Sequence, residues 1–110
     1  PLTASTRHLV NAQTLATMKP TASVINTARG ALIDEAALID ALNEGVIAGA
    51  GLDVQEVEPL DDASPLYTMD NVIITPHMGW RGLETRRRLV SMVGDNIRAF
   101  AAGHPINRVG

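Results

Sequence analysis

The chain has 110 residues, of which 45% are apolar and only 3% aromatic, so one small domain with an aliphatic core is possible. Its formal net charge of -3 gives no electrostatic reason to expect nucleic acid or an anionic membrane as a partner. The lack of cysteine excludes a disulfide framework and thiol chemistry. No run approaches the roughly 18 apolar residues that a membrane span needs, so we expect a cytoplasmic protein.

The first part of the chain predicts a short helix and a strand. The chain begins at Pro1 without an initiator Met, from which we expect a fragment of a longer protein. Residues 11–18 are typical of a short helix that Asn11 caps and Pro20 stops. The run from Ala22 to Asn26 is short and rich in β-branched residues, which indicates a buried strand.

The next part predicts a strand–helix–strand unit. Gly30 allows a turn, and Asp34 is placed to cap a helix whose apolar face is Ala37, Leu38, Ala41 and Leu42. Gly45 stands where a left-handed residue usually ends a helix. Residues 46–54 follow as a second strand. Short links between these elements favour a parallel sheet and an α/β fold.

The last part predicts a loop, a third strand and a long helix. Residues 55–70 show no periodicity, and a loop of this length is usually functional. Residues 72–74 form the third strand, which ends at Pro76. A helix runs from about residue 83 to 102, and its apolar stripe is Leu83, Val90, Val93, Ile97 and Phe100. If the chain has a domain boundary, the turn at 77–82 is the best place for it.

Polar residues stand where each predicted strand gives way to a loop. Arg29 follows the first strand, Glu56 and Glu58 follow the second, and His77 follows the third. Because the carboxyl ends of parallel strands form the ligand crevice, these residues are expected to converge on one site. An acid–base pair beside a fixed cation suits proton transfer on a substrate that carries a carboxylate.

Each of these residues also has a simpler interpretation. Arg29 could grip a carboxylate with two hydrogen bonds, or it could be a surface residue at a turn. Asp53 could hydrogen-bond a polar ligand or cap the loop after its strand. Glu56 and Glu58 point to opposite sides of an extended chain, so at most one should face the site and favour a histidine's imidazolium form.

The remaining candidates are weaker. His77 stands at a strand end, whereas His8 and His104 are expected to be solvated. No second His or Cys is spaced to complete a metal site, so we expect no metal. Gly49-Ala50-Gly51 is not a dinucleotide fingerprint, because Val54 stands where the third glycine would be. The basic run of Arg81 and Arg86–Arg88 indicates a solvated or subunit-facing surface.

Taken together, these segments resemble the D-isomer-specific 2-hydroxyacid dehydrogenases over essentially the whole chain. The turn His77-Met78-Gly79-Trp80 is most similar to the glycerate/hydroxypyruvate reductase branch. The segments that carry the resemblance are Pro1-Leu2-Thr3 with Thr6, Met18-Lys19-Pro20, Asn26-Thr27-Ala28-Arg29-Gly30, Gly49-Ala50-Gly51-Leu52-Asp53-Val54, Glu58-Pro59, Asn71-Val72-Ile73, Thr75-Pro76-His77, Asn96-Ile97-Arg98-Ala99-Phe100 and Gly103-His104-Pro105-Ile106-Asn107.

The resemblance implies a fold and a division of the chain. Residues 1–79 would be the C-terminal half of a Rossmann-like NAD-binding domain with a parallel sheet. Residues 80–110 would be a long helix and tail that return to a missing substrate domain. The Gly-rich phosphate turn and the residue that chooses NAD over NADP are absent. Because these parts are absent, we expect the isolated chain to lack activity. The resemblance implies that the parent enzyme is a homodimer.

The resemblance also implies roles for single residues. His77 would be the catalytic acid/base, Glu58 the acid that pairs with it, and Arg29 the residue that binds the carboxylate of a small 2-oxo or 2-hydroxy acid. The Glu58 carboxylate should then approach a ring nitrogen of His77 within about 3.5 Å. The cofactor would be NAD or NADP. The positions that would line its site are Pro1, Thr6, Thr27, Ala28, Arg29, Asp53, His77 and Gly79.

Two other functions stay open on the sequence alone. A corepressor-like protein of the same fold could bind NAD(H), keep Arg29, Glu58 and His77, and act through protein association. A cofactor-free, non-catalytic α/β module is the third possibility. Turnover of 2-oxo acids by the parent would distinguish the enzyme from the corepressor-like protein. NADH titration of the parent would test the cofactor-free module.

Overall fold

The computed structural model describes residues 1–109 and divides the chain into two compact units. The first unit is Pro1–Met78, and the second begins at Gly79. This division falls inside the turn at 77–82.

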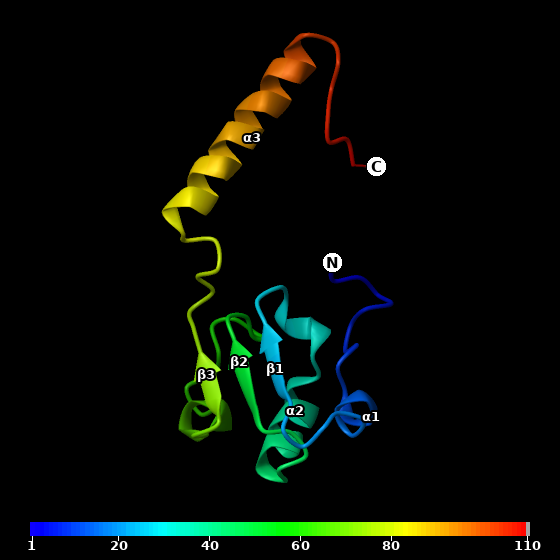
Figure 1. The fold of residues 1–110 in the computed structure, drawn as a ribbon, viewed down its shortest axis with the longest axis vertical. Helices are drawn as coiled ribbons and strands as arrows, with labels where there is room; N and C mark the ends of the chain where they lie inside the picture. The colour runs from blue at the N-terminus through cyan, green and yellow to red at the C-terminus, as the bar shows by residue number, and fades with distance from the viewer. Residues whose placement is uncertain (110) are drawn as a thin grey trace. The chain divides into compact units, whose positions relative to one another are not determined.

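The first unit is built on a parallel sheet of three strands in the order β1–β2–β3 (Figure 1). The strands are β1 (Ser23–Asn26), β2 (Gly49–Leu52) and β3 (Val72–Ile74). The predicted parallel α/β arrangement is confirmed. The second strand was predicted too long, because Val46 still belongs to the end of the preceding helix, where its N–H donates to the carbonyl of Ala41.

Two α-helices in this unit begin where the sequence predicts. Helix α1 (Ala12–Leu15) is capped by Asn11, whose Oδ1 accepts from the N–H groups of Gln13 and Thr14. The prediction of a helix over 11–18 was too long, since the bond from Met18 N–H to the Leu15 carbonyl is of the tighter three-residue type.

Helix α2 (Glu35–Asn43) has both of its predicted ends. The Asp34 carboxylate accepts from the Ala37 N–H at 3.1 Å and caps the N-terminus. At the other end Gly45 has a φ of +68°, a left-handed conformation that glycine adopts without steric cost. Together with the Val46–Ala41 bond, this ends the helix in a Schellman motif.

The sheet has one covered face and one open apolar face. On β1 the side chains of Val24 and Asn26 are buried, whereas Ile25 between them is 74% exposed. The register aligns Ile25 with Gly51 and Ile73, and Ile73 is 72% exposed. The core therefore forms on the other face, where residues from both helices and the strands cluster: Leu15, Val24, Ile33, Leu38, Ala41, Leu42, Ile47, Ala50, Leu52 and Leu66.

Two single-turn 3-10 helices complete the unit, η1 (Gly30–Leu32) and η2 (Pro65–Thr68). Helix η2 lies within the segment 55–70, which was predicted to be a loop throughout. The sequence missed it because one turn leaves no measurable period, although Ser64 caps it and Leu66 is fully buried.

The second unit contains helix α3 (Leu83–Ala101), close to its predicted bounds. Gly103 follows it with a φ of +76°. The predicted apolar stripe, including Val90, Ile97 and Phe100, is exposed to solvent. No helix among the described residues combines the length and apolar character needed to cross a membrane.

Candidate active site

The three strands end in register, and this sets the position of the candidate site. Asn26 pairs with Leu52, and Leu52 pairs with Ile74. The segments that follow these residues therefore leave the same edge of the sheet. Arg29, Glu58 and His77 stand on those segments, as the parallel topology predicted.

His77 and Glu58 form a hydrogen-bonded pair at this edge. His77 Nδ1 lies 2.7 Å from Glu58 Oε2, inside the predicted limit. The other carboxylate oxygen accepts from the N–H of Gln55 at 3.1 Å. The hydrogen bond from His77 lowers the pKa of Glu58, and the Gln55 N–H and the positive charge of Arg29 act in the same direction. Glu58 is thus held in its ionised form.

Asp53 hydrogen-bonds residues on both sides of His77. This carboxylate is 5% exposed, and its Oδ1 accepts from the Thr75 hydroxyl and from the Met78 N–H. His77 itself has a φ of +48°, an uncommon value for a residue other than glycine. The sequence left two roles open for Asp53, and these bonds are neither of them, because they hold the segment after β3 and not the loop that follows β2. Its predicted contact with the cofactor stays a prediction.

Arg29 lies on a turn that Asn26 shapes. The buried Asn26 side chain accepts from the Ala28 N–H at 3.1 Å and donates to the Arg29 carbonyl at 2.9 Å. The Arg29 side chain is exposed, and its Nη1 donates to the Ala28 carbonyl. Glycine is required at the next position, because a Cβ on Gly30 would overlap the carbonyl of Gln55. This close approach joins the Arg29 turn to the segment that carries Glu58.

An open cavity of about 740 Å³ borders the His77–Glu58 pair. Its other walls are mostly apolar and include Leu66 and Ile74. Gln55 also lines the cavity, and its Nε2 is buried without a hydrogen-bond partner. The pair therefore combines an ionised carboxylate with an imidazole beside a space large enough for a small molecule.

The other residues predicted to line a cofactor site fall into three places. Thr6 and Pro1 share the N-terminal turn, where the Thr6 hydroxyl donates to the Pro1 carbonyl at 2.9 Å. Thr27 and Ala28 are exposed just after β1. Gly79 opens the second unit. Within residues 1–109, no three His, Cys, Asp or Glu side chains are grouped so that they could hold a metal ion.

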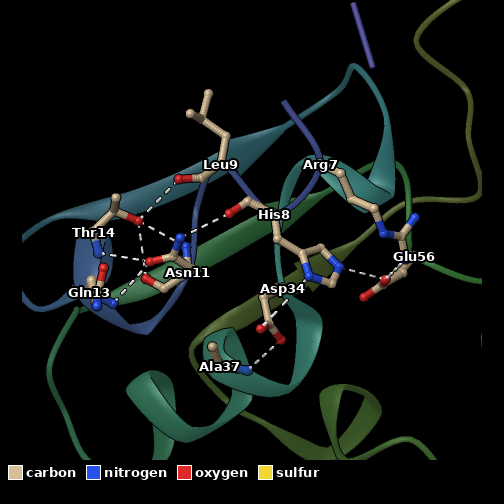
Figure 2. A network of polar contacts seen from close by, with 9 residues as sticks. All are labelled: Arg7, His8, Leu9, Asn11, Gln13, Thr14, Asp34, Ala37 and Glu56. Carbon is tan, nitrogen blue, oxygen red and sulfur yellow. Dashed lines mark hydrogen bonds and ion pairs between the residues drawn. The ribbon is translucent and has the colours of Figure 1, made fainter. Parts of the chain in front are cut away.

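His8 contradicts its prediction, because it is not simply solvated. Its Nε2 lies 2.7 Å from Glu56 Oε1, and its Nδ1 is 4.0 Å from Asp34 (Figure 2). Of the two neighbouring acids, Glu58 therefore pairs with His77 and Glu56 pairs with His8, in keeping with the prediction that at most one of them faces the His77 site. No local pattern predicts the contact between His8 and Glu56, since its two members are 48 positions apart.

Comparison with known proteins identifies the family of this chain. Residues 1–79 match the family described as "D-isomer specific 2-hydroxyacid dehydrogenase, NAD binding domain". A glycerate dehydrogenase from Methylorubrum extorquens is 47% identical over 99% of this chain and 35% of its own length. A glyoxylate reductase from Korarchaeum cryptofilum is 47% identical over 94% of this chain and 31% of its own length.

A solved structure shares the fold closely. It is the D-isomer specific 2-hydroxyacid dehydrogenase from Xanthobacter autotrophicus Py2 in complex with NADPH and MES, with 50% identity and a TM-score of 0.89 over 100% of this chain and 45% of that one. The chain spans about a third of the length of the curated relatives it matches. It belongs to the D-isomer-specific 2-hydroxyacid dehydrogenase family, and residues 1–79 match the family's NAD-binding domain.

Proposed function

We propose that the parent protein of this chain is an NAD(P)-dependent D-2-hydroxyacid dehydrogenase. It would transfer a hydride between the nicotinamide cofactor and a small 2-oxo or 2-hydroxy acid. The observation that carries this proposal is the 2.7 Å pairing of His77 and Glu58 at the sheet edge that also bears the Arg29 turn. The names of the relatives support the same class of reaction.

Arg29 is the residue proposed to bind the substrate carboxylate. Its guanidinium is always charged and can donate two parallel hydrogen bonds to the two carboxylate oxygens. It is exposed at the turn after β1, so an incoming acid can reach it. The same positive charge polarises the adjacent carbonyl group, because it favours electron density on the carbonyl oxygen and leaves the carbon more electrophilic toward hydride.

His77 is proposed to exchange the proton. During reduction its imidazolium donates a proton to the substrate oxygen, and during oxidation its neutral form removes that proton. Because Nδ1 pairs with Glu58, we assign the transferred proton to Nε2. Glu58 then fixes the ring orientation and stabilises the imidazolium with its negative charge.

The residues around this edge fit a dinucleotide cofactor. Small residues, Thr27 and Ala28, leave the end of β1 open to close approach, and a carboxylate, Asp53, stands at the end of β2 as a hydrogen-bond acceptor. With Pro1 and Thr6 and with Gly79, these are the positions proposed to hold NAD or NADP. When bound, the cofactor supplies or accepts the hydride.

The relatives favour a short substrate. Glyoxylate, hydroxypyruvate and glycerate appear in their names, so a two- or three-carbon acid is the proposed substrate class. The homodimeric state of the parent and its cytoplasmic location stay predictions from the resemblance and the composition.

The direct test is turnover by the full-length parent. Glyoxylate, hydroxypyruvate and pyruvate should each be offered with NADH and with NADPH, and oxidation of the cofactor followed by absorbance. We expect reduction of at least one acid, and chiral analysis of the hydroxypyruvate or pyruvate product should give the D-isomer. NADH binding without turnover of any acid would contradict the proposal and favour the corepressor-like alternative. Failure to bind either cofactor would favour the non-catalytic module.

A further inference from the structure

A second polar cluster is built on the same segment as Glu58, two positions earlier in the chain. The Glu56 carboxylate is its centre, and Figure 2 shows the side chains that converge on it. Glu56 Oε1 accepts from Arg7 Nη2 and from His8 Nε2, each at 2.7 Å. The Glu56 side chain is 22% exposed, compared with 55% for Arg7 and 35% for His8. The contact with His8 is therefore the better shielded of the two.

His8 is presented to Glu56 from a fixed backbone. Its φ of +52° lies in the left-handed region, which only surrounding contacts make stable for a residue other than glycine. Two such contacts are present, because its N–H donates to the Ala31 carbonyl at 2.9 Å and its carbonyl accepts from Asn11 Nδ2 at 3.0 Å. The imidazole is thus placed in advance as a partner for Glu56.

The main chain next to the Glu56 side chain is held as well. The Glu56 N–H donates to Glu35 Oε2 at 3.2 Å. The carbonyl of Gln55 packs against Gly30, where no side chain would fit. The peptide between residues 55 and 56 is therefore fixed by contacts to helix α2 and to the Arg29 turn.

This anchored segment also supplies a donor to the proposed acid–base pair. The Gln55 N–H donates to Glu58 Oε1 at 3.1 Å, while Glu58 Oε2 pairs with His77 at 2.7 Å. A shift of the segment around residues 55 and 56 would move that donor and turn the Glu58 carboxylate away from His77. Small displacements of this kind are enough to slow catalysis substantially.

We propose that Glu56, held by His8, is a positioning residue that acts through Glu58 on the proton-transfer group His77. The inference rests on the proposed function, since it concerns the efficiency of that acid–base pair. An exposed ion pair contributes little to the free energy of folding. The proposed role of Glu56 is different, because Glu56 affects the geometry of Glu58 and not only overall stability.

The experiment compares Glu56→Ala with the unchanged full-length parent in 2-oxo acid reduction. We expect kcat to fall about tenfold, because the Glu58 carboxylate is less well oriented. KM for the oxo acid should stay within about twofold, since the carboxylate-binding Arg29 is untouched. The pH at which reduction declines should move lower, because a displaced Glu58 stabilises the imidazolium less well. Asp62→Asn removes a charge from an exposed position of the same segment and should change none of these values.

Two further variants separate positioning from charge and from general destabilisation. Glu56→Gln keeps an oxygen that can accept from His8, so it should restore most of the lost kcat. An electrostatic role for Glu56 would instead make Gln as harmful as Ala. In a Glu58→Gln background, Glu56→Ala should have no further effect on the pH profile, because Glu56 acts through Glu58.

Additive effects of the two substitutions would overturn the inference, as would an unchanged pH profile in Glu56→Ala. If that variant does not fold, His8→Ala removes the same contact from the other side and should give the same profile. A parent that reduces no 2-oxo acid contradicts the proposed function itself. A parent in which Glu58→Gln shifts the profile and neither Glu56→Ala nor His8→Ala does contradicts only the positioning role.

Discussion

Two histidine–glutamate pairs with the same 2.7 Å separation take their glutamates from one short segment of the chain. Glu58 pairs with His77 at the sheet edge, beside an open cavity. Glu56 pairs with His8 in a cluster that also contains the exposed Arg7. The distance between the two side chains therefore does not distinguish a candidate catalytic pair from a structural one.

The surroundings of the two pairs are what differ. The first pair is at the ends of parallel strands, where ligands bind in this class of fold. The second ties the N-terminal segment to the same loop, with Asp34 4.0 Å from His8 on the far side. Catalysis should depend strongly on the first pair, whereas the second should matter through geometry and stability.

The sharpest way to break this comparison is to make the same substitution in both pairs. In the full-length parent, His77→Gln should lower kcat for reduction by about 10²–10⁴-fold, the usual contribution of a general acid. His8→Gln keeps an amide donor toward Glu56 and should change kcat by no more than about tenfold. Steady-state kinetics on both variants decides the matter. Equal losses would mean that the two histidines were assigned to the wrong roles.

The first pair could be predicted from the sequence because its geometry follows from simple rules. Arg29, Glu58 and His77 each follow a strand, and parallel strands bring their carboxyl ends to one edge. The residues alone did not choose between Glu56 and Glu58, and the family resemblance assigned Glu58. The roles of Arg29, Glu58 and His77 as substrate and proton-transfer residues came from the family resemblance, since a strand-end position alone does not specify a reaction.

The second pair could not be predicted, because it depends on tertiary contacts between distant residues. His8 stands in a polar turn that resembles any solvated segment, and its partner is 48 positions away. For the same reason the second strand was predicted too long, since the bond that commits Val46 to the helix end is visible only in the structure. The helix ends at Asn11, Asp34 and Gly45 could be predicted from local patterns, because the contacts that form these caps are between residues close in the sequence.

Each glutamate has an arginine that acts on it, Arg29 for Glu58 and Arg7 for Glu56, and these two arginines provide a second matched comparison. Arg29→Lys should weaken transition-state binding by about 2–4 kcal/mol, because lysine keeps the charge but cannot donate two parallel hydrogen bonds to one carboxylate. Arg7→Lys should leave kcat/KM nearly unchanged, since the Arg7 side chain is 55% exposed and its hydrogen bond is to Glu56, away from the substrate carboxylate. Measuring kcat and KM for both variants tests this. A parent that tolerates Arg29→Lys would make Arg29 a surface turn residue.

Asp34 tests what the second cluster contributes to stability. Its carboxylate caps α2 through the Ala37 N–H, so Asp34→Ala should lower the free energy of unfolding by about 0.5–2 kcal/mol. Asp34→Asn keeps a capping oxygen and should cost only a small part of this. Urea unfolding of the full-length variants measures both values. If Asn were as destabilising as Ala, the charge beside His8 would matter more than the cap.

The smallest expected effect concerns the pH dependence of stability. The hydrogen bond from His77 lowers the pKa of Glu58 below its ordinary value of about 4.5, so the ionised carboxylate favours the folded state. This stabilisation is present above about pH 4.5 and is lost as the pH falls through the lowered folded pKa. Glu58→Gln should therefore be less stable than the parent at neutral pH, and the difference should close below that value.

The comparison requires urea unfolding at several pH values, with Asp62→Asn as the exposed control from the same segment. Because Glu58 is itself partly exposed, solvent screening keeps the expected difference small. A difference between parent and Glu58→Gln that stays constant down to the acid end would show that it does not come from the ionised carboxylate. The hydrogen bond between Glu58 and His77 would then matter for its geometry alone.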